Sequence, residues 1–324
     1  MSIKRRRKNK IFLHWKRGRR SPILTYFELL HRVELEWIHW LHQMRTPFLD
    51  QLFQWLNFFD RPEFFFILIP VIWLGEGWKA GLRLFSILFL SGLANQILKE
   101  LFASPRPFHL EPSLGILEVS GFGFPSGAAQ NVILLSGLLV RLSKSVWKWG
   151  VALAYIGLVS LSRVYLGVHF PTDVLGGWLI GFCLLGMYLY IRPALERRLA
   201  KFKVFSLFLF SQALPGFFLL GRYSVPTMMI CSIAMGLGMG LWVAHLYQLF
   251  PLPPQTSREY ALRACIGVGG TFACYGVTLL LWPLSDELLY LFPRFFPVGL
   301  WGSLGSHLVC LRMLSQREPS LPDD

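Results

Sequence analysis

Long apolar runs alternate with short polar loops along most of this sequence. A membrane-spanning helix needs about 20 mostly apolar residues, and nine segments reach or approach that length. These segments are 62–76, 82–103, 126–142, 148–165, 172–192, 203–221, 225–249, 261–283 and 294–313, of which the first is short. The pattern therefore predicts an all-α fold, a polytopic bundle of membrane helices.

Residues 23–60 differ from these runs because they mix charged side chains with large apolar ones. The charged residues are Glu28, Arg32, Glu34, Glu36, Asp50 and Asp60, and the large apolar ones include Trp37, Trp40, Leu41, Phe48 and Trp55. A helix with this mixture lies in the membrane interface and does not cross the bilayer. We therefore expect 23–60 to be an amphipathic interfacial segment.

The composition agrees with a membrane protein. Of the 324 residues, 54% are apolar and only 15% are charged, whereas a soluble domain has about 25% charged residues. Together with a mean hydropathy of +0.48, this excludes a disordered chain and argues against a soluble enzyme.

The five cysteines all lie in apolar runs without metal-ligand spacing, so we expect buried thiols. No apolar run with a small-residue cleavage site follows the basic N-terminus, so no cleaved signal peptide is expected.

The net charge of +14 is concentrated at the N-terminus, where residues 1–20 hold ten Lys and Arg side chains and no acid. Such a tail is attracted to anionic lipid headgroups by about 1 kcal/mol per charge. We expect a membrane as its partner and no nucleic acid. The chain is divided accordingly into a basic tail (1–22), the interfacial segment (23–60), a core (61–192) and C-terminal transmembrane helices (203–314).

The charges of the loops predict an orientation. The loops 76–83, 141–148 and 192–203 are rich in Lys and Arg and lie on one side of the membrane, which the positive-inside rule makes cytoplasmic. The loops 104–125 and 163–171 then face the opposite compartment. One conflict follows, because the basic tail lies on that opposite side unless the segment 23–60 crosses. Either the segment crosses or the tail is an exception to the rule.

Three cations, Lys99, Arg106 and Arg163, lie in or beside the two loops on the far side. Any one of them alone is ordinarily a side chain that reaches from a helix end to the membrane surface. Their occurrence together on one membrane face indicates a function. Guanidinium and ammonium groups are the natural ligands of a tetrahedral oxyanion, so the three cations predict a phosphate site.

Two helix starts add to this site. Ser126 and Gly127 follow Pro125 at the start of one helix, where a hydroxyl and free N–H groups form an anion site. His169 and Asp173 are four residues apart at the start of another helix and can share a face. An imidazole oriented by a carboxylate is a nucleophile. The pattern therefore predicts attack by His169 on a phosphorus atom held among cations.

These residues form three blocks that resemble the signature of the type-2 phosphatidic acid phosphatase superfamily. The signature reads Lys-x6-Arg-Pro, then Pro-Ser-Gly-His, then Ser-Arg-x5-His-x3-Asp. The first and third blocks match in full, as Lys99, Arg106 and Pro107 and as Ser162, Arg163, His169 and Asp173. The resemblance covers about residues 50–192, which makes the core a phosphatase core of six helices. The later helices are similar to those of longer branches such as the sphingosine-1-phosphate phosphatases.

The resemblance implies an integral membrane enzyme that hydrolyses a lipid phosphate or a polyprenyl or lipid diphosphate. His169 would form a phosphohistidine that water then hydrolyses, with Asp173 fixing the His169 tautomer. The phosphate would be bound by Lys99, Arg106, Arg163, Ser126 and Gly127. The cations take the place of a metal, so neither a metal nor another cofactor is expected. The enzyme would span an inner or plasma membrane, with its active site facing away from the cytoplasm.

The second block departs from the signature, because Ala128 stands where the family has a histidine. In the family that histidine is the general acid that protonates the leaving group. Three interpretations stay open: an engineered His-to-Ala substitution, a natural variant that still turns over, and a pseudoenzyme that binds without cleaving. His109 could replace the missing acid, or it is simply a histidine of an interfacial loop.

The missing acid affects two substrate classes differently. An alkoxide leaving a phosphate monoester needs a proton, whereas a phosphate leaving a diphosphate is already a weak base. Losing a general acid costs about 10²–10⁴ in rate, so residual activity should favour diphosphates. The alternative functions are a non-catalytic lipid-phosphate-binding scaffold or transporter and a vanadate-dependent haloperoxidase. The haloperoxidase branch is soluble, which this apolar chain contradicts.

Overall fold

The computed structural model describes residues 22–141, 145–221, 224–282, 284 and 288–315. Within these ranges the chain forms helices and no strands, which confirms the predicted all-α fold. The predicted basic tail lies outside the described residues except for Pro22.

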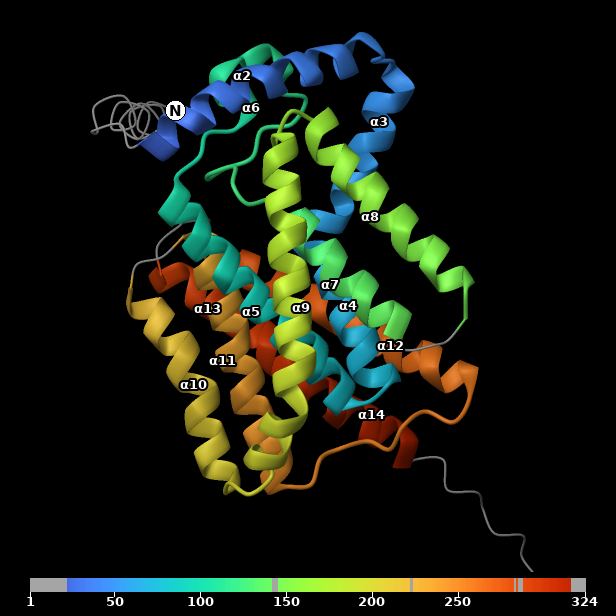
Figure 1. Ribbon diagram of the computed structural model, residues 1–324. Helices are drawn as coiled ribbons and strands as arrows, with labels where there is room; N and C mark the ends of the chain where they lie inside the picture. The colour runs from blue at the N-terminus through green and yellow to red at the C-terminus, as the bar shows by residue number, and fades with distance from the viewer. Residues whose placement is uncertain (1–21, 142–144, 222–223, 283, 285–287, 316–324) are drawn as a thin grey trace, which may run out of the picture.

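The segment 23–60 forms α2 (Pro22–Gln43), α3 (Pro47–Leu56) and the 3-10 turn η1 (Asn57–Asp60). Figure 1 shows α2 lying across one end of the bundle, from which α3 descends toward α4. This segment therefore does not cross the bundle. One face of α2 is buried on the protein, whereas Leu29, Val33, Trp37 and Trp40 are exposed on another face. An exposed apolar stripe on such a helix suits the membrane interface, and the interfacial position stays a prediction.

The core helices follow in an up-and-down order. They are α4 (Pro62–Gly75), α5 (Trp78–Phe102), α7 (Gly127–Arg141), α8 (Trp147–Tyr165) and α9 (Pro171–Leu199). The loop between α5 and α7 carries the short helix α6 (Pro107–Leu110) and the 3-10 turn η2 (Pro112–Leu114). Helix α7 packs against α8 and α9, and α4 packs against α5.

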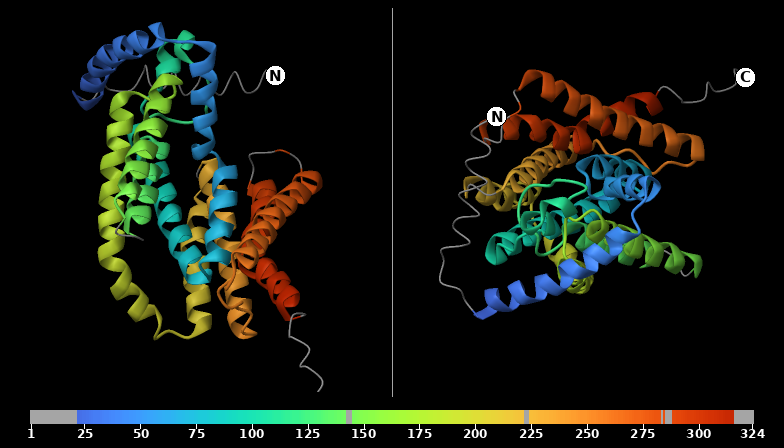
Figure 2. Two further views of the ribbon diagram at one scale, coloured as in Figure 1. Left: turned by 90° about the vertical axis from the view of Figure 1, so that its right-hand side faces the viewer. Right: turned by 90° about the horizontal axis from the view of Figure 1, so that it is seen from above.

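The C-terminal part is also helical. It consists of α10 (Val204–Leu220), α11 (Val225–Leu246), α12 (Ser257–Leu281), α13 (Leu288–Leu300), the π-helical turn η3 (Trp301–Gly305) and α14 (Ser306–Ser315). In Figure 2, α12 to α14 and the pair α8 and α9 lie on opposite sides of α4 and α5. Each of the nine segments predicted as apolar helices is helical in the structure.

Four helical segments are long and apolar enough to cross a membrane: Trp78–Leu110, Pro171–Leu199, Val225–Leu246 and Ser257–Leu281. Three shorter apolar helices accompany them: Pro62–Gly75, Gly127–Arg141 and Val204–Leu220. The chain is therefore an integral membrane protein.

The C-terminal helices share a core with α4 and α5. Trp73 and Phe85 from these two helices are buried in one cluster with Phe218, Leu237 and other residues of α10, α11 and α14. The indole N–H of Trp73 donates to His307 Nε2 at 2.9 Å, and both side chains are buried. The core helices and the C-terminal helices therefore pack together as one body. A cavity can form at the boundary between them.

Candidate active site

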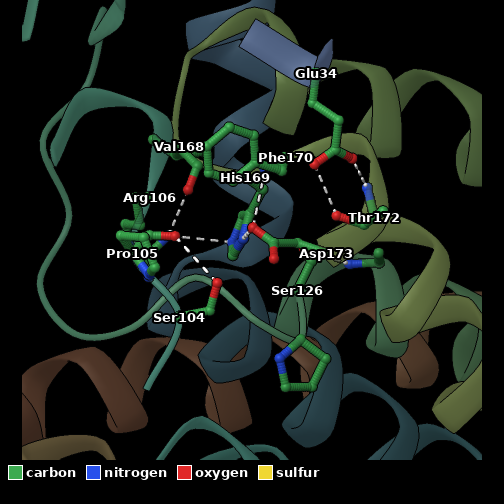
Figure 3. A network of polar contacts seen from close by, with 12 residues as sticks. Glu34, Ser104, Pro105, Arg106, Ser126, Val168, His169, Phe170, Thr172 and Asp173 are labelled. Carbon is green, nitrogen blue, oxygen red and sulfur yellow. Dashed lines mark hydrogen bonds and ion pairs between the residues drawn. The ribbon is translucent and has the colours of Figure 1, made fainter. Parts of the chain in front are cut away.

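The structure brings the predicted cations and the predicted nucleophile to one cavity beneath α2. Lys99 lies in the last turn of α5, Arg106 precedes α6, Arg163 lies in the last turn of α8, and His169 lies between α8 and α9. All four line the same cavity, and so does Gly127. Figure 3 shows Arg106, His169 and Asp173 pointing toward one another.

The chain reaches this arrangement because α5 cannot continue. Ala103 ends the helix with a left-handed φ of 45°. Pro105 interrupts the helical backbone, and Pro107 begins the separate short helix α6. Gly123 lets the returning loop pass close to the site. A Cβ at Gly123 would lie 2.7 Å from the Pro105 carbonyl oxygen and 2.9 Å from Asp173 Oδ2, so only glycine fits there.

The two neighbours of the His169 ring fix its tautomer. Nδ1 lies 3.2 Å from Asp173 Oδ2, and Nε2 lies 3.2 Å from Arg106 Nη1. Asp173 Oδ2 also accepts the Phe170 N–H at 2.9 Å, so this oxygen acts as an acceptor. A guanidinium has donors only. The His169 proton is therefore assigned to Nδ1, and the lone pair on Nε2 accepts a hydrogen bond from Arg106 Nη1.

His169 is buried, and this position affects its charge. Burial holds the pKa of His169 well below its usual value of 6.5, and the nearby cations Arg106, Lys99 and Arg163 lower this pKa further. The imidazole is therefore neutral at neutral pH. A neutral ring with its lone pair on Nε2 is the form that can attack an electrophile.

Arg106 is only 3% exposed and connects two loops. Its Nη1 donates to the Val168 carbonyl at 2.8 Å, its Nε donates to Gly121 at 2.9 Å, and its Nη2 donates to Ser120 at 3.3 Å. The guanidinium thus holds the loop that follows η2 against the turn that carries His169. Arg106 therefore holds the site's loops in place and also contributes positive charge to the site.

Arg163 is 1% exposed and is held by residues that the sequence analysis did not assign to the site. Its Nη1 donates to Asn57 Oδ1 at 2.7 Å and to Asp60 Oδ2 at 3.2 Å. Its Nε and Nη2 donate to the Ser162 hydroxyl. The sequence contains one sign of this contact, the polar pair Asn57 and Asp60 that flanks two phenylalanines just before α4.

Lys99 differs from Arg163, because no described residue forms a hydrogen bond or an ion pair with its ammonium group.

The start of α7 contributes less than the sequence suggested. Ser126 is fully buried, its N–H donates to the Asp173 carbonyl at 2.9 Å, and its hydroxyl accepts the Ala129 N–H at 3.4 Å. Ser126 is therefore a helix cap in this structure, and a part in phosphate binding stays a prediction. Gly127 lines the cavity. Its N–H begins the helix, where no preceding turn supplies a carbonyl partner.

Neither of the two residues connected with the missing general acid lines the cavity, although Ala128 directly follows Gly127, which does. Ala128 is 2% exposed and packs in an apolar cluster with Val132 and Val159. His109 is exposed, and its Nδ1 accepts the Arg106 N–H at 3.2 Å. This placement favours the interpretation of His109 as a loop histidine.

A buried polar network behind the start of α7 was missed by the sequence analysis. The Asn95 side-chain amide donates to the Pro125 carbonyl at 3.2 Å and to Gln130 Oε1 at 3.1 Å. Gln130 in turn donates to the Ser91 carbonyl at 2.9 Å and to its hydroxyl at 2.7 Å. The network joins α5 to α7 and positions the backbone at 125–127. The sequence contains a sign of this network, because the polar residues Ser91 and Asn95 lie one helical turn apart in an apolar run.

A second missed contact comes from α2. Glu34 Oε1 accepts the Thr172 N–H at 2.6 Å, and Oε2 accepts the Thr172 hydroxyl at 3.0 Å. Figure 3 shows this pair beside Asp173. The His31 ring stacks on Phe170 with a centroid separation of 4.0 Å. Helix α2 therefore covers the turn that carries His169 and caps the start of α9.

No metal site accompanies these groups in the described part of the chain, where no three His, Cys, Asp or Glu side chains gather suitably for an ion. The ionisable groups of the cavity lining are the three cations, the neutral imidazole of His169 and two acids, Asp60, which pairs with Arg163, and Glu118. The cations and the imidazole suit a phosphate group.

Comparison with known proteins places this region in one family. A family model described as the PAP2 superfamily matches residues 80–197. The chain is 33% identical to phosphatidylglycerophosphatase B of Bacillus subtilis, over 44% of this chain and 74% of that protein. It is 32% identical to the undecaprenyl-diphosphatase of Sulfolobus acidocaldarius, over 32% of this chain and 50% of that protein. The match thus spans only half the length of the second relative.

A solved structure is also similar. It is described as the crystal structure of a transmembrane PAP2-type phosphatidylglycerolphosphate phosphatase from Bacillus subtilis. The TM-score is 0.44 and the identity is 25%, over 54% of this chain and 90% of that chain.

The contact between Glu34 and Thr172 predicts a local effect of substitution. Glu34→Ala leaves the Thr172 N–H without its acceptor, which should lower the free energy of local opening by about 1–3 kcal/mol. Hydrogen–deuterium exchange should become faster in residues 166–174. Glu36→Ala is the control, because Glu36 is exposed on the same helix. Unchanged exchange in the Glu34 variant would show that α2 does not hold this turn.

Proposed function

Because the chain belongs to the PAP2 superfamily, we propose that it is an integral membrane phosphatase acting on a lipid phosphate or a polyprenyl or lipid diphosphate. The observation that carries this proposal is the lining of one cavity by Lys99, Arg106, Arg163 and His169. The printed names of two relatives, an undecaprenyl-diphosphatase and a phosphatidylglycerophosphatase, support the substrate class.

The reaction begins with a phosphate group bound among the three cations. His169 Nε2 attacks the phosphorus, the bond from phosphorus to the leaving oxygen breaks, and a phosphohistidine forms. Asp173 accepts the hydrogen bond from Nδ1 and stabilises the ring as it becomes positively charged. Arg106 Nη1, 3.2 Å from Nε2, lies within reach of an oxygen on the transferring group.

Water completes the cycle. Its oxygen bonds to phosphorus, the phosphorus–nitrogen bond breaks, and the electron pair returns to Nε2. The proton lost by water passes to the solvent or to the released phosphate. Each step develops charge on oxygens that already face fixed donors, which is the largest contribution such a site can make to the rate.

The leaving group decides which substrates suit this chain. The Ala128 side chain packs among apolar neighbours and supplies no proton. A leaving phosphate tolerates that absence better than a leaving alkoxide does. The site as it stands therefore favours lipid diphosphates. The alternative function is a non-catalytic protein that binds lipid phosphates, and Ala128 is the observation that favours it.

The positions of the loops support an active site on the non-cytoplasmic side of the membrane. In Figure 1 the turn before α9 and the loop that carries α6 lie at the end of the bundle covered by α2. The basic loop after α9 lies at the other end, 29 helical residues away. Since basic loops remain in the cytoplasm, the active site faces the non-cytoplasmic side.

Phosphate release by the purified protein tests the proposed function. With lipid diphosphates and lipid monophosphates as substrates, the unsubstituted protein should prefer diphosphates. Ala128→His should raise monophosphate turnover by about 10²–10⁴, the usual contribution of a general acid, and diphosphate turnover by less. His169→Asn should release no phosphate.

Two other outcomes would count against this account. Equal proportional gains on the two substrate classes would contradict the leaving-group argument. No release from any lipid by either form would support the non-catalytic alternative.

The pH dependence of kcat/KM tests the state of His169. The attacking nitrogen must be unprotonated, so activity is lost as the pH falls through the pKa of His169, which burial and the cations hold below 6.5. Lys99→Gln removes one of these cations and should move the acidic limb to higher pH. The ionisation of the substrate is common to both proteins, so the difference between the two profiles reports on the enzyme. An unchanged limb, or one moved to lower pH, would contradict the electrostatic argument.

A further inference from the structure

The cavity that contains the phosphate site extends far beyond it. Its volume is about 670 Å³, within the range of roughly 300–1,000 Å³ that is usual for a site holding one small ligand. The cations lie toward one end. The remainder is lined mainly by apolar side chains, among them Phe66, Phe85, Leu88, Phe89, Ile233 and Val298.

The cavity is deep as well as apolar. On α5 the lining residues run from Lys99 down to Phe85, and 14 residues of α-helix rise about 21 Å. The hydrocarbon core of a bilayer is about 30 Å thick, so one leaflet contributes about 15 Å. The cavity therefore has the length needed for a hydrocarbon chain whose phosphate lies among the cations.

One wall of this cavity comes from helices outside the region matched by the family. Residues 80–197 match the family, whereas the wall opposite α4 and α5 is built by α11, α13 and η3. Met229, Ile230 and Ile233 supply its apolar surface. Gly302 lines the cavity without a side chain, whereas Gly299 lets α13 approach α11 closely, because a Cβ there would clash with the Ile233 carbonyl group.

Resting on the proposed function, we propose that α11, α13 and η3 form a binding site for a single hydrocarbon chain of the lipid phosphate substrate. The phosphate binds Lys99, Arg106 and Arg163, and the chain lies between α5 and the C-terminal helices. The site has room for one chain. It therefore selects alkyl or prenyl phosphates and diphosphates with one chain over phospholipids with two.

Gly302 allows the cavity to be filled without disturbing its walls. A Cβ at Gly302 would meet no atom within 4 Å, so a larger side chain at this position grows into the open space. Gly302→Trp therefore occludes the site. Gly276→Trp is the matched control, because a Cβ at Gly276 also meets nothing within 4 Å and Gly276 does not line the cavity.

Photo-crosslinking tests this proposal without requiring turnover. The probe is a long-chain alkyl phosphate with a diazirine at the end of its chain, added to the full chain in detergent or nanodiscs. Mass spectrometry should place the crosslinks in peptides covering 225–246 and 288–305. The Gly302→Trp variant should lose them by about tenfold or more, since a filled cavity has no space for the chain end. The Gly276→Trp variant should keep them.

The same probe without its phosphate should crosslink much less, because the cations anchor the phosphate. Crosslinks confined to outward-facing residues such as Leu179 and Phe217 would overturn the proposal. Labelling of the internal peptides that Gly302→Trp leaves unchanged would also overturn it. If the Gly302→Trp variant does not fold, the positions of the crosslinks in the unsubstituted protein decide whether the chain site exists. Phosphate release with crosslinks elsewhere would refute the chain site alone. Internal crosslinks without any phosphate release would refute the hydrolysis and keep the chain site.

Discussion

The site depends on buried positive charge. Arg106 and Arg163 are almost wholly inaccessible, and with Lys99 they line a cavity that is otherwise mainly apolar. Burying a cation costs several kcal/mol unless it is paired. Carbonyl groups around Arg106 and the side chains of Asn57 and Asp60 around Arg163 meet part of that cost. A phosphate group would complete the pairing. Burial and the same cations together hold the pKa of His169 below its usual value and keep the ring neutral. In the proposed mechanism, one electrostatic arrangement therefore both binds the substrate and activates the attacking group.

The rest of the structure holds this arrangement in place from three sides. From above, α2 caps the start of α9 through Glu34 and Thr172. Between α5 and α7, the network of Ser91, Asn95 and Gln130 fixes the start of α7. On the side of α4 and α5, the C-terminal helices pack against these two helices and form part of the cavity wall. The residues of the candidate site come from helix ends and from the adjoining turns, and contacts between helices hold these segments in place.

The sequence predicted the helices, and it singled out residues that the structure brings to one cavity, for identifiable reasons. A membrane helix must satisfy its own backbone, so apolar length alone predicts it, and charged residues are rare enough in such a chain that Lys99, Arg106 and Arg163 were conspicuous. The supporting contacts were not predictable in this way. Glu34 and Thr172 are 138 residues apart, and only the packing of α2 on α9 brings them together. Ser126 shows the opposite case, because a local motif suggested a free N–H that the fold pairs with the Asp173 carbonyl.

Transfer of a phosphoryl group to His169 is the central claim, and it can be observed directly. The purified protein is mixed with a lipid diphosphate radiolabelled in its terminal phosphate, quenched in alkaline detergent and digested for mass spectrometry. The account predicts an acid-labile label on His169 that decays as inorganic phosphate appears, with no label in His169→Asn. A label on a different residue, or phosphate release by His169→Asn at the rate of the unsubstituted protein, would contradict it.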